Sequence, residues 1–213
     1  MKYVYLHGWG SSPQSAKAQY FLDSFALHNI PLQIPDLNWP DFFSLTLSRQ
    51  IQQLSHLLKQ QEQVTIIGSS LGGLTALWLA EYLPQVQRLV LLAPALNFVA
   101  NAKRQLRPEA YQQWQEQGWL TVQHYSRQQD CKLHYQFLEN MLAYTDQNLQ
   151  RPLPTLLFHG VFDEVIPLHD SQDFVTKRPW VDFFPLQDDH SLMSSLPKIM
   201  SEMQKGLYRT EII

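Results

Sequence analysis

The sequence contains a single cysteine, Cys131, in 213 residues. One thiol excludes an internal disulfide and a cysteine-based zinc cluster, and it is typical of proteins from reducing compartments. The first residues form no long apolar stretch with a small-residue cleavage site, because an expected strand begins almost at once. No apolar run approaches the roughly 20 residues that a membrane-spanning helix needs. We therefore expect a cytoplasmic protein without a membrane span.

Charged residues are also few, at 16% of the chain, and the formal net charge is only -3. No basic excess is present to attract nucleic acid or an anionic membrane, so neither is an expected partner. The hydrophobic content of 45% is ordinary for a folded protein. The length suits one well-cored domain. We expect a single domain over residues 1–213, and no motif indicates its oligomeric state.

Short apolar segments alternate with amphipathic ones along most of the chain. This alternation predicts an α/β fold with a mostly parallel sheet of about six strands and helices on both faces. The expected strands are 2–6, 32–34, 64–67, 88–92, 155–158 and 181–184. The expected helices are 16–27, entered through a Ser12-Pro13 cap, 41–60 capped by Asp41, 71–83, 168–176 and 191–208.

Residues 97–151 break this pattern. They contain no convincing strand, and two or three amphipathic helices are expected near 103–117 and 132–144. We interpret the segment as a helical cap insertion. Its aromatic and methionine side chains either line an acyl pocket or pack the cap onto the domain. Its basic group is either a site for an anionic leaving group, such as the phosphates of coenzyme A, or a solvated face. The side chains in question are Tyr111, Trp114, Trp119, Tyr125, Tyr135, Phe137 and Met141, and the basic group is Lys103, Arg104 and Arg107.

The pattern G-x-S-x-G lies between an expected strand and an expected helix, at residues 68–72. In such a strand-to-helix turn the serine occupies a strained corner, and its hydroxyl is raised above the sheet. The glycines are needed because a Cβ at either position would meet the adjoining strand or helix. The pattern predicts that Ser70 is a nucleophile.

Two other interpretations of this stretch stay open. A glycine-rich turn without chemistry would have the same sequence. The phosphate-binding pattern G-x-x-x-x-G-K-[ST] also aligns with Gly68, Gly73 and Thr75, but Leu74 stands where that pattern requires lysine. Without the lysine, the loop cannot reach the β- and γ-phosphates of a nucleotide.

A serine nucleophile needs a histidine base, and the base needs an acid that holds its tautomer. In strand-turn-helix hydrolases these residues follow the chain order serine, acid, histidine. Asp163 comes just after one expected strand, and His190 lies in the loop after the last one. Glu164 is expected to point elsewhere, while Asp188 and Asp189 stand too close to His190 in sequence to contact its ring comfortably. We predict Asp163 as the acid and His190 as the base.

The loop after the first strand, His7-Gly8-Trp9-Gly10, is a candidate for part of an oxyanion hole. Acyl transfer needs N–H donors directed at the developing oxyanion. Leu71, at the start of the helix after Ser70, supplies one donor, and we predict that Trp9 supplies the second. The alternative is a plain glycine turn in which Trp9 only packs against the core.

Together these pieces resemble the α/β-hydrolase superfamily and, more closely, the YqiA-like small bacterial esterases. The resemblance rests on "YLHGWGSSPQSAKA" (5–18), "IPDLNWP" (34–40), "GSSLGG" (68–73) and "GVFDEVIP" (160–167). It covers most of the chain but is weak in the insertion. Two Asp residues precede His190 where the family often has Gly-Gly-Asn-His, and the sheet is minimal because the HG motif follows the first strand.

The resemblance implies hydrolysis of carboxylic esters or acyl thioesters. Ser70 would be the nucleophile, Asp163 the acid and His190 the base, with Trp9 and Leu71 as oxyanion donors. No metal or organic cofactor is needed for this chemistry, and a small acyl ester or thioester is the expected partner. Two alternatives stay open. One is a catalytically silent binding protein with this fold, and the other is use of the same triad for amide, C–C or acyl-transfer chemistry.

Overall fold

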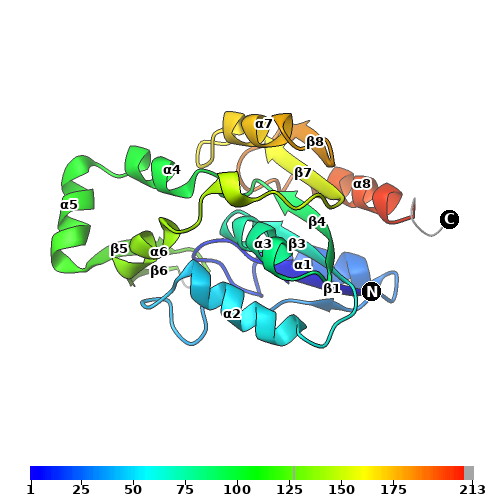
Figure 1. The fold of residues 1–213 in the computed structure, drawn as a ribbon, viewed down its shortest axis with the longest axis horizontal. Helices are drawn as coiled ribbons and strands as arrows, with labels where there is room; N and C mark the ends of the chain where they lie inside the picture. Colours follow the sequence, from blue (N-terminus) through cyan, green and yellow to red (C-terminus); the bar gives the residue numbers. More distant parts are fainter. Residues whose placement is uncertain (127, 209–213) are drawn as a thin grey trace.

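Six parallel strands form the central sheet in the computed structural model, which describes residues 1–126 and 128–208 (Figure 1). Their order across the sheet is β2-β1-β3-β4-β7-β8, and each neighbouring pair is parallel. The expected mostly parallel sheet of about six strands is confirmed. The strands are β1 (Lys2–Leu6), β2 (Leu32–Gln33), β3 (Val64–Ser69), β4 (Val86–Leu92), β7 (Thr155–Gly160) and β8 (Val181–Leu186).

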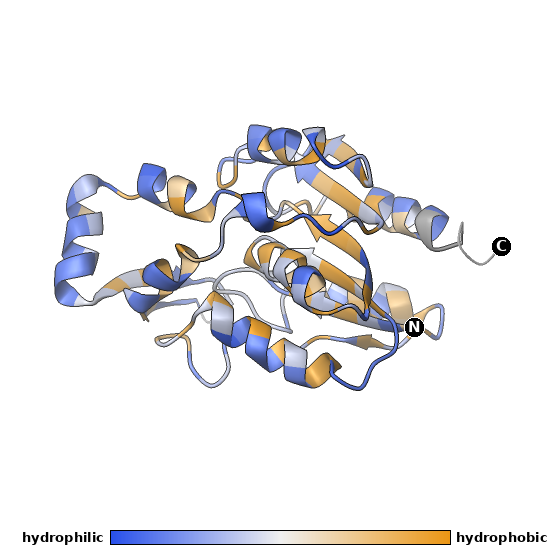
Figure 2. Ribbon diagram, in the orientation of Figure 1, coloured by the Kyte–Doolittle hydropathy of each residue, from blue (hydrophilic) through white to orange (hydrophobic). Residues whose placement is uncertain are grey.

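Helices cover both faces of this sheet, as the alternation predicts. On one face, Phe21 of α1 (Ala16–Ala26) and Ile199 of α8 (Leu196–Tyr208) share a buried cluster. On the other face lie α2 (Leu47–Leu58), α3 (Leu71–Tyr82) and α7 (Leu168–Thr176). Figure 2 shows the hydrophobic strands between helices that turn hydrophilic residues outward. Burial on both faces explains why the inner strands are nearly continuous apolar runs.

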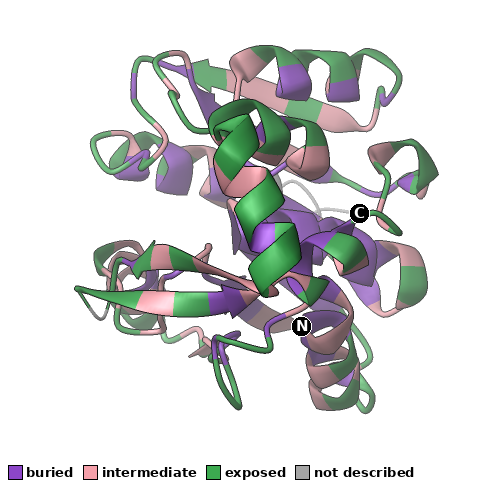
Figure 3. Cartoon of the chain, turned by 90° about the vertical axis from the view of Figure 1, so that its left-hand side faces the viewer, coloured by how far each residue is buried: buried purple, intermediate pink, exposed green. Residues whose placement is uncertain are grey.

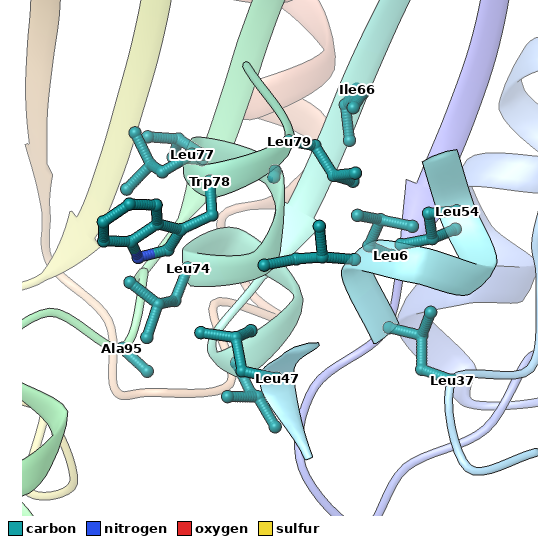
Figure 4. Packing of buried hydrophobic residues seen from close by; sticks show 14 of the residues in the cluster. Leu6, Leu37, Leu47, Leu54, Ile66, Leu74, Leu77, Trp78, Leu79 and Ala95 are labelled. Atoms are coloured by element: carbon teal, nitrogen blue, oxygen red, sulfur yellow. The ribbon is translucent and has the colours of Figure 1, made fainter. Parts of the chain in front are cut away.

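The helix after Ser70 is the most deeply buried helix of this core. Every residue of α3 from Leu71 to Ala80 is buried. Figure 4 shows Leu74 and Trp78 of this helix packed beside Leu47 of α2. Each such side chain stabilises the fold by about 2 kcal/mol through removal of apolar surface from water. The nucleophile candidate therefore stands on a rigid support.

Three helices begin later than expected, and one of them is α8, which starts at Leu196 rather than at 191. The Ser12 hydroxyl accepts only from the Gln14 N–H in a local turn, at 3.2 Å, and Ser15 is the N-cap of α1. Likewise, Asp41 closes a turn with the Ser44 N–H, at 2.7 Å, and Thr46 is the N-cap of α2. Asp and Ser stabilise turns as readily as helix starts, so the sequence pattern does not distinguish the two.

The insertion is not purely helical, so the expectation that residues 97–151 lack strands is wrong. Its antiparallel hairpin pairs Trp119 with His134 and His124 with Gln129. The expected helix near 132–144 is correspondingly short. Thr, Gln, Asp and Cys in the hairpin give little apolar alternation, and its pairing depends on contacts with other segments. The elements are α4 (Phe98–Gln105), α5 (Pro108–Gln117), β5 (Trp119–His124), β6 (Gln129–His134), α6 (Gln136–Met141) and the 3-10 turn η1 (Asp146–Asn148).

The insertion lies beyond the carboxyl ends of the strands, at the left of Figure 1. Figure 3 looks onto it and shows α5 with a largely exposed surface. Trp114, Phe137 and Met141 are buried, so these three side chains pack the insertion rather than line an open pocket. The basic group is exposed, as expected of a solvated face; it comprises Lys103, Arg104 and Arg107. Among the described residues, no helix combines the length and apolarity that crossing a membrane requires.

Candidate active site

Ser70 occupies a strained corner between β3 and α3. Its φ of 52° and ψ of -118° lie where a residue with a side chain is rarely found. The Ser70 N–H donates to the Leu92 carbonyl at 2.9 Å, and the Ser70 carbonyl accepts from the N–H groups of Gly73 and Ala95. These backbone hydrogen bonds hold the strained conformation in place. Such geometry is typical of a nucleophile turn.

Close backbone packing makes this turn possible. A Cβ on Gly72 would collide with the carbonyl oxygens of Leu6 and His7 at the end of β1. Only glycine lets the first turn of α3 lie so close to the neighbouring strand. The N-terminal end of α3, with its partial positive charge, is thereby placed beside the loop that follows β1.

The three residues predicted as nucleophile, base and acid form one hydrogen-bonded chain. His190 Nε2 lies 3.2 Å from Ser70 Oγ, and His190 Nδ1 lies 2.7 Å from Asp163 Oδ2. The carboxylate accepts from Nδ1–H, which leaves Nε2 free to accept from the serine hydroxyl. Since β3, β7 and β8 are parallel, the loops that carry the three residues meet at one edge of the sheet.

The Asp163 carboxylate is fully buried and receives several hydrogen bonds. Oδ1 accepts from the N–H groups of Val165 and Ile166, both at 2.8 Å. Oδ2 lies 2.7 Å from His190 Nδ1 and 3.2 Å from His159 Nε2. Burial acts to raise the pKa of Asp163, but the hydrogen bonds and the nearby imidazole charge outweigh it and hold that pKa well below its usual range. The acid is therefore ionised at neutral pH.

The carboxylates that neighbour Asp163 and His190 in the sequence are not part of the hydrogen-bonded chain to Ser70. Glu164 is exposed. Asp188 shapes the loop before His190: its carboxylate accepts from the Asp189 N–H at 2.9 Å and from the Ser195 N–H at 2.8 Å. Burial acts to raise the pKa of Asp188, but its serine and backbone hydrogen bonds lower it overall. No sequence pattern indicates this loop-shaping contact.

The loop predicted to supply an oxyanion donor lies directly against Ser70. A Cβ on Gly8 would stand 3.2 Å from Ser70 Cβ and 3.8 Å from Ser70 Oγ. Trp9 comes after the last ladder pair of β1, Leu6 with Gly68, so its N–H is not a ladder donor. Leu71 is the first residue of α3, where an N–H has no acceptor within the helix.

The side chain of His7 holds this loop in its conformation. The Leu37 N–H donates to His7 Nε2 at 3.1 Å, so Nδ1 carries the proton and donates to the Gly8 carbonyl at 3.0 Å. The Asn38 amide also donates to the Ser11 carbonyl at 2.7 Å. The segment around residues 36–38 therefore supports the loop beside Ser70, a relationship that depends on long-range contacts.

The indole of Trp9 packs against aromatic rings from three other segments. Its ring centroid lies 4.8 Å from that of Phe137 and 5.6 Å from that of Phe42, both in edge contacts. A third contact joins it to Phe98 at 6.3 Å. Trp9 thus joins the loop after β1 to α4 and α6 of the insertion.

A lysine reaches the nucleophile turn from the opposite side of the sheet. Lys17 Nζ donates to Ser69 Oγ at 3.0 Å, and the buried phenol of Tyr5 also interacts with Ser69. Burial of the ammonium lowers the pKa of Lys17 to about 8. Three carboxylates act in the opposite direction, those of Asp163, Asp188 and Asp189. No motif in the sequence indicates this position of Lys17, because the contact joins residues 52 positions apart.

The fold matches solved structures of α/β hydrolases at low sequence identity. A candidate hydrolase from Agrobacterium vitis S4 is 22% identical with a TM-score of 0.83, covering 98% of this chain and 87% of that one. Alpha/beta hydrolase domain-containing protein 10 from mouse is 18% identical with a TM-score of 0.81, covering 98% and 90%. Est1E from Butyrivibrio proteoclasticus, with ferulic acid bound, is 16% identical with a TM-score of 0.78, covering 97% and 89%.

The sequence comparisons give the family. No curated protein matches the chain. The family described as "Uncharacterised protein family (UPF0227)" matches residues 2–205, nearly the whole length. The chain therefore belongs to the UPF0227 family, and it has the α/β-hydrolase fold.

Proposed function

We propose that the protein is a serine hydrolase that cleaves carboxylic esters or acyl thioesters through an acyl-enzyme on Ser70. The observation that carries this proposal is the continuous hydrogen-bonded chain from Ser70 Oγ through His190 to the buried Asp163 carboxylate. A binding protein with this fold would have no need of that arrangement. The strained conformation of Ser70 supports the same function, since strain of this kind concentrates at reactive residues.

In the first half-reaction, Ser70 Oγ bonds to the acyl carbon while His190 Nε2 takes the hydroxyl proton. The carbonyl oxygen becomes an oxyanion, which accepts hydrogen bonds from the N–H groups of Leu71 and Trp9. Asp163 stabilises the imidazolium without taking its proton. The bond to the alcohol or thiol then breaks, and the leaving group takes the proton from Nε2.

In the second half-reaction, a water molecule gives a proton to His190 Nε2 and its oxygen bonds to the acyl carbon. The second tetrahedral intermediate uses the same two donors. It collapses with return of the proton to Ser70 Oγ and release of the carboxylic acid. The proposed reaction needs no metal or organic cofactor, because the chain itself supplies the nucleophile, the base and the oxyanion donors.

The surroundings of the acid and the base favour a substrate with an apolar part. Phe162 and Val165 flank the Asp163 loop and Met193 follows His190, and all three side chains are exposed. Est1E, a structural neighbour, holds ferulic acid, an aromatic acid. This likeness supports small acyl esters or thioesters as the proposed substrates.

The proposal is tested by labelling the protein with a fluorophosphonate probe and locating the label by mass spectrometry. We expect the label on Ser70, loss of p-nitrophenyl acetate hydrolysis in Ser70→Ala, and unchanged hydrolysis in Ser12→Ala. A label on another residue, or full turnover by Ser70→Ala, contradicts the proposal. If no acyl ester or thioester is turned over but a ligand binds tightly by calorimetry, the binding-protein alternative is favoured.

A further inference from the structure

We propose that His159, together with Ser171, is a positioning pair that holds the Asp163 carboxylate against His190. The proposal rests on the proposed function, because it assigns a role in the same site. His159 is the next-to-last residue of β7, and Ser171 lies in α7. Both side chains are fully buried. His159 therefore lies behind the acid, away from the substrate, and acts only through Asp163.

The contacts of His159 fix which of its nitrogens is the donor. Nε2 lies 3.2 Å from Asp163 Oδ2 and 3.0 Å from the Ile166 carbonyl oxygen. An ionised carboxylate and a carbonyl oxygen only accept hydrogen bonds, so Nε2 carries a proton in either charge state of the ring. Nδ1 lies 2.8 Å from Ser171 Oγ, and this hydroxyl can donate or accept as the ring requires.

Two imidazoles consequently share one carboxylate oxygen. His190 Nδ1 and His159 Nε2 both contact Oδ2, while the N–H groups of Val165 and Ile166 occupy Oδ1. Three N–H groups, those of Val165, Ile166 and His190, donate to the carboxylate, and the His159 Nε2–H is shared between Oδ2 and the Ile166 carbonyl. These contacts give the carboxylate one preferred orientation, which directs Oδ2 at His190. Its side chain is 0% exposed, so no bulk water stands ready to replace a lost donor.

The electrostatic effect of His159 also favours the ionised carboxylate of Asp163. Its hydrogen bond is one of the contributions that lower the pKa of Asp163 against the effect of burial. Without this donor, the buried carboxylate binds a proton more readily and turns more freely. The base then loses both its fixed tautomer and the stabilisation of its cation, although Ser70, His190 and Asp163 are all still present.

A purely structural role for His159 predicts different behaviour. A buried polar residue that only supports packing lowers the folded fraction and leaves each folded molecule fully active. A positioning residue lowers turnover per folded molecule and shifts the acid limb of the pH profile. The substitution His159→Met removes the donor at similar length, whereas His159→Gln places an amide N–H near the position of Nε2.

The control is Leu157→Ala, because Leu157 lies two residues earlier on β7 and is equally buried. It creates a cavity without touching Asp163. Active molecules are counted with the fluorophosphonate probe, and p-nitrophenyl acetate is the substrate. For His159→Met we expect kcat per labelled site to fall about tenfold or more, KM to stay within about twofold, and the acid limb to move to lower pH, because the His190 imidazolium is less stabilised. His159→Gln should recover most of kcat, and Ser171→Ala should lie between wild type and His159→Met.

A second measurement does not depend on hydrolysis. The proton between His190 Nδ1 and Asp163 should give a low-field NMR signal, which His159→Met weakens or shifts upfield and which Ser70→Ala and Leu157→Ala leave in place. Unchanged kcat, pH profile and NMR signal in His159→Met overturn the proposal, as does a loss of activity that only matches the loss of folded protein. If Ser70 is not labelled, the proposed function fails, while the NMR signal still decides whether His159 positions Asp163.

Discussion

Gly8 lies against Ser70 so closely that a Cβ on Gly8 would stand 3.2 Å from Ser70 Cβ. The contact joins the loop after β1, which continues into Trp9, to the turn after β3. The Ser69 carbonyl oxygen would also be only 3.3 Å from that Cβ, so an added side chain would push the neighbouring atoms apart by a few tenths of an ångström. A side chain at position 8 must therefore displace either the loop or the nucleophile.

We predict that Gly8→Ala lowers kcat about tenfold to a hundredfold, because small displacements of reacting groups are costly. The measurement is hydrolysis of p-nitrophenyl acetate per labelled Ser70. Gly118→Ala is the control, since Gly118 has a positive φ of 76° but its nearest neighbour is 4.0 Å from the added Cβ. That variant should lose about 1 kcal/mol of stability and keep its kcat. Equal kcat in Gly8→Ala and wild type would show that the loop tolerates displacement.

The substitution Trp9→Ala distinguishes the role of the Trp9 backbone N–H from the role of its indole side chain. The N–H donor remains, but the indole no longer packs against Phe42, Phe98 and Phe137. We expect the free energy of unfolding to fall by about 2 kcal/mol. We expect p-nitrophenyl acetate hydrolysis to persist and p-nitrophenyl octanoate to become a relatively better substrate, because space opens beside the acyl site. Complete loss of acetate hydrolysis in folded Trp9→Ala contradicts this division of roles.

Asp163→Asn is expected to lower kcat by about 10³-fold or more while KM changes little. The amide cannot stabilise the imidazolium, and its NH₂ group competes for the wrong tautomer of His190. Glu164→Gln is the matched control, since it removes one negative charge from the next, exposed position. Steady-state kinetics on both variants tests the assignment, which is wrong if the two variants behave alike.

The lowered pKa of Lys17 predicts how the free energy of unfolding changes with pH. Its pKa is lowered from 10.5 to about 8 in the folded protein, mainly by burial. Between pH 8 and pH 10.5, Lys17 is protonated in the unfolded chain more often than in the folded protein. The contribution of Lys17 to the free energy of unfolding therefore rises from pH 8 to pH 10.5. Below pH 8, burial of the charged ammonium disfavours folding. The full effect is about 3 kcal/mol at most.

Urea unfolding of wild type and Lys17→Met at pH 7.5 and pH 10 tests this sign. Both variants share every other titrating group, so the difference between them isolates Lys17. We expect Lys17→Met to gain stability relative to wild type at pH 7.5 and to lose that advantage at pH 10. The same difference at both pH values would mean that the Lys17 pKa is not lowered by folding.

The elements around the candidate site were predictable to different degrees. The alternation of apolar and amphipathic segments and the G-x-S-x-G pattern are local, and they placed the parallel sheet and the turn at Ser70 correctly. Helix starts were less predictable, because Ser12 and Asp41 stabilise turns as well as helices. The hairpin that ends in His134 is not predictable from the sequence, because its residues give little apolar alternation and it packs on distant segments, for example through the hydrogen bond from the His134 N–H to the Phe43 carbonyl.

By itself, the sequence determined the fold class and the chain order of Ser70, Asp163 and His190, since periodicity and order along the chain are local properties. Only the tertiary structure decided what surrounds them. Parallel strands bring their carboxyl ends to one edge, and there the Nε2 of His159 meets the acid while Lys17 approaches the nucleophile turn from the other face. No spacing along the chain specifies such contacts, because they depend on which buried side chains the packed sheet and helices place within a few ångströms of one another.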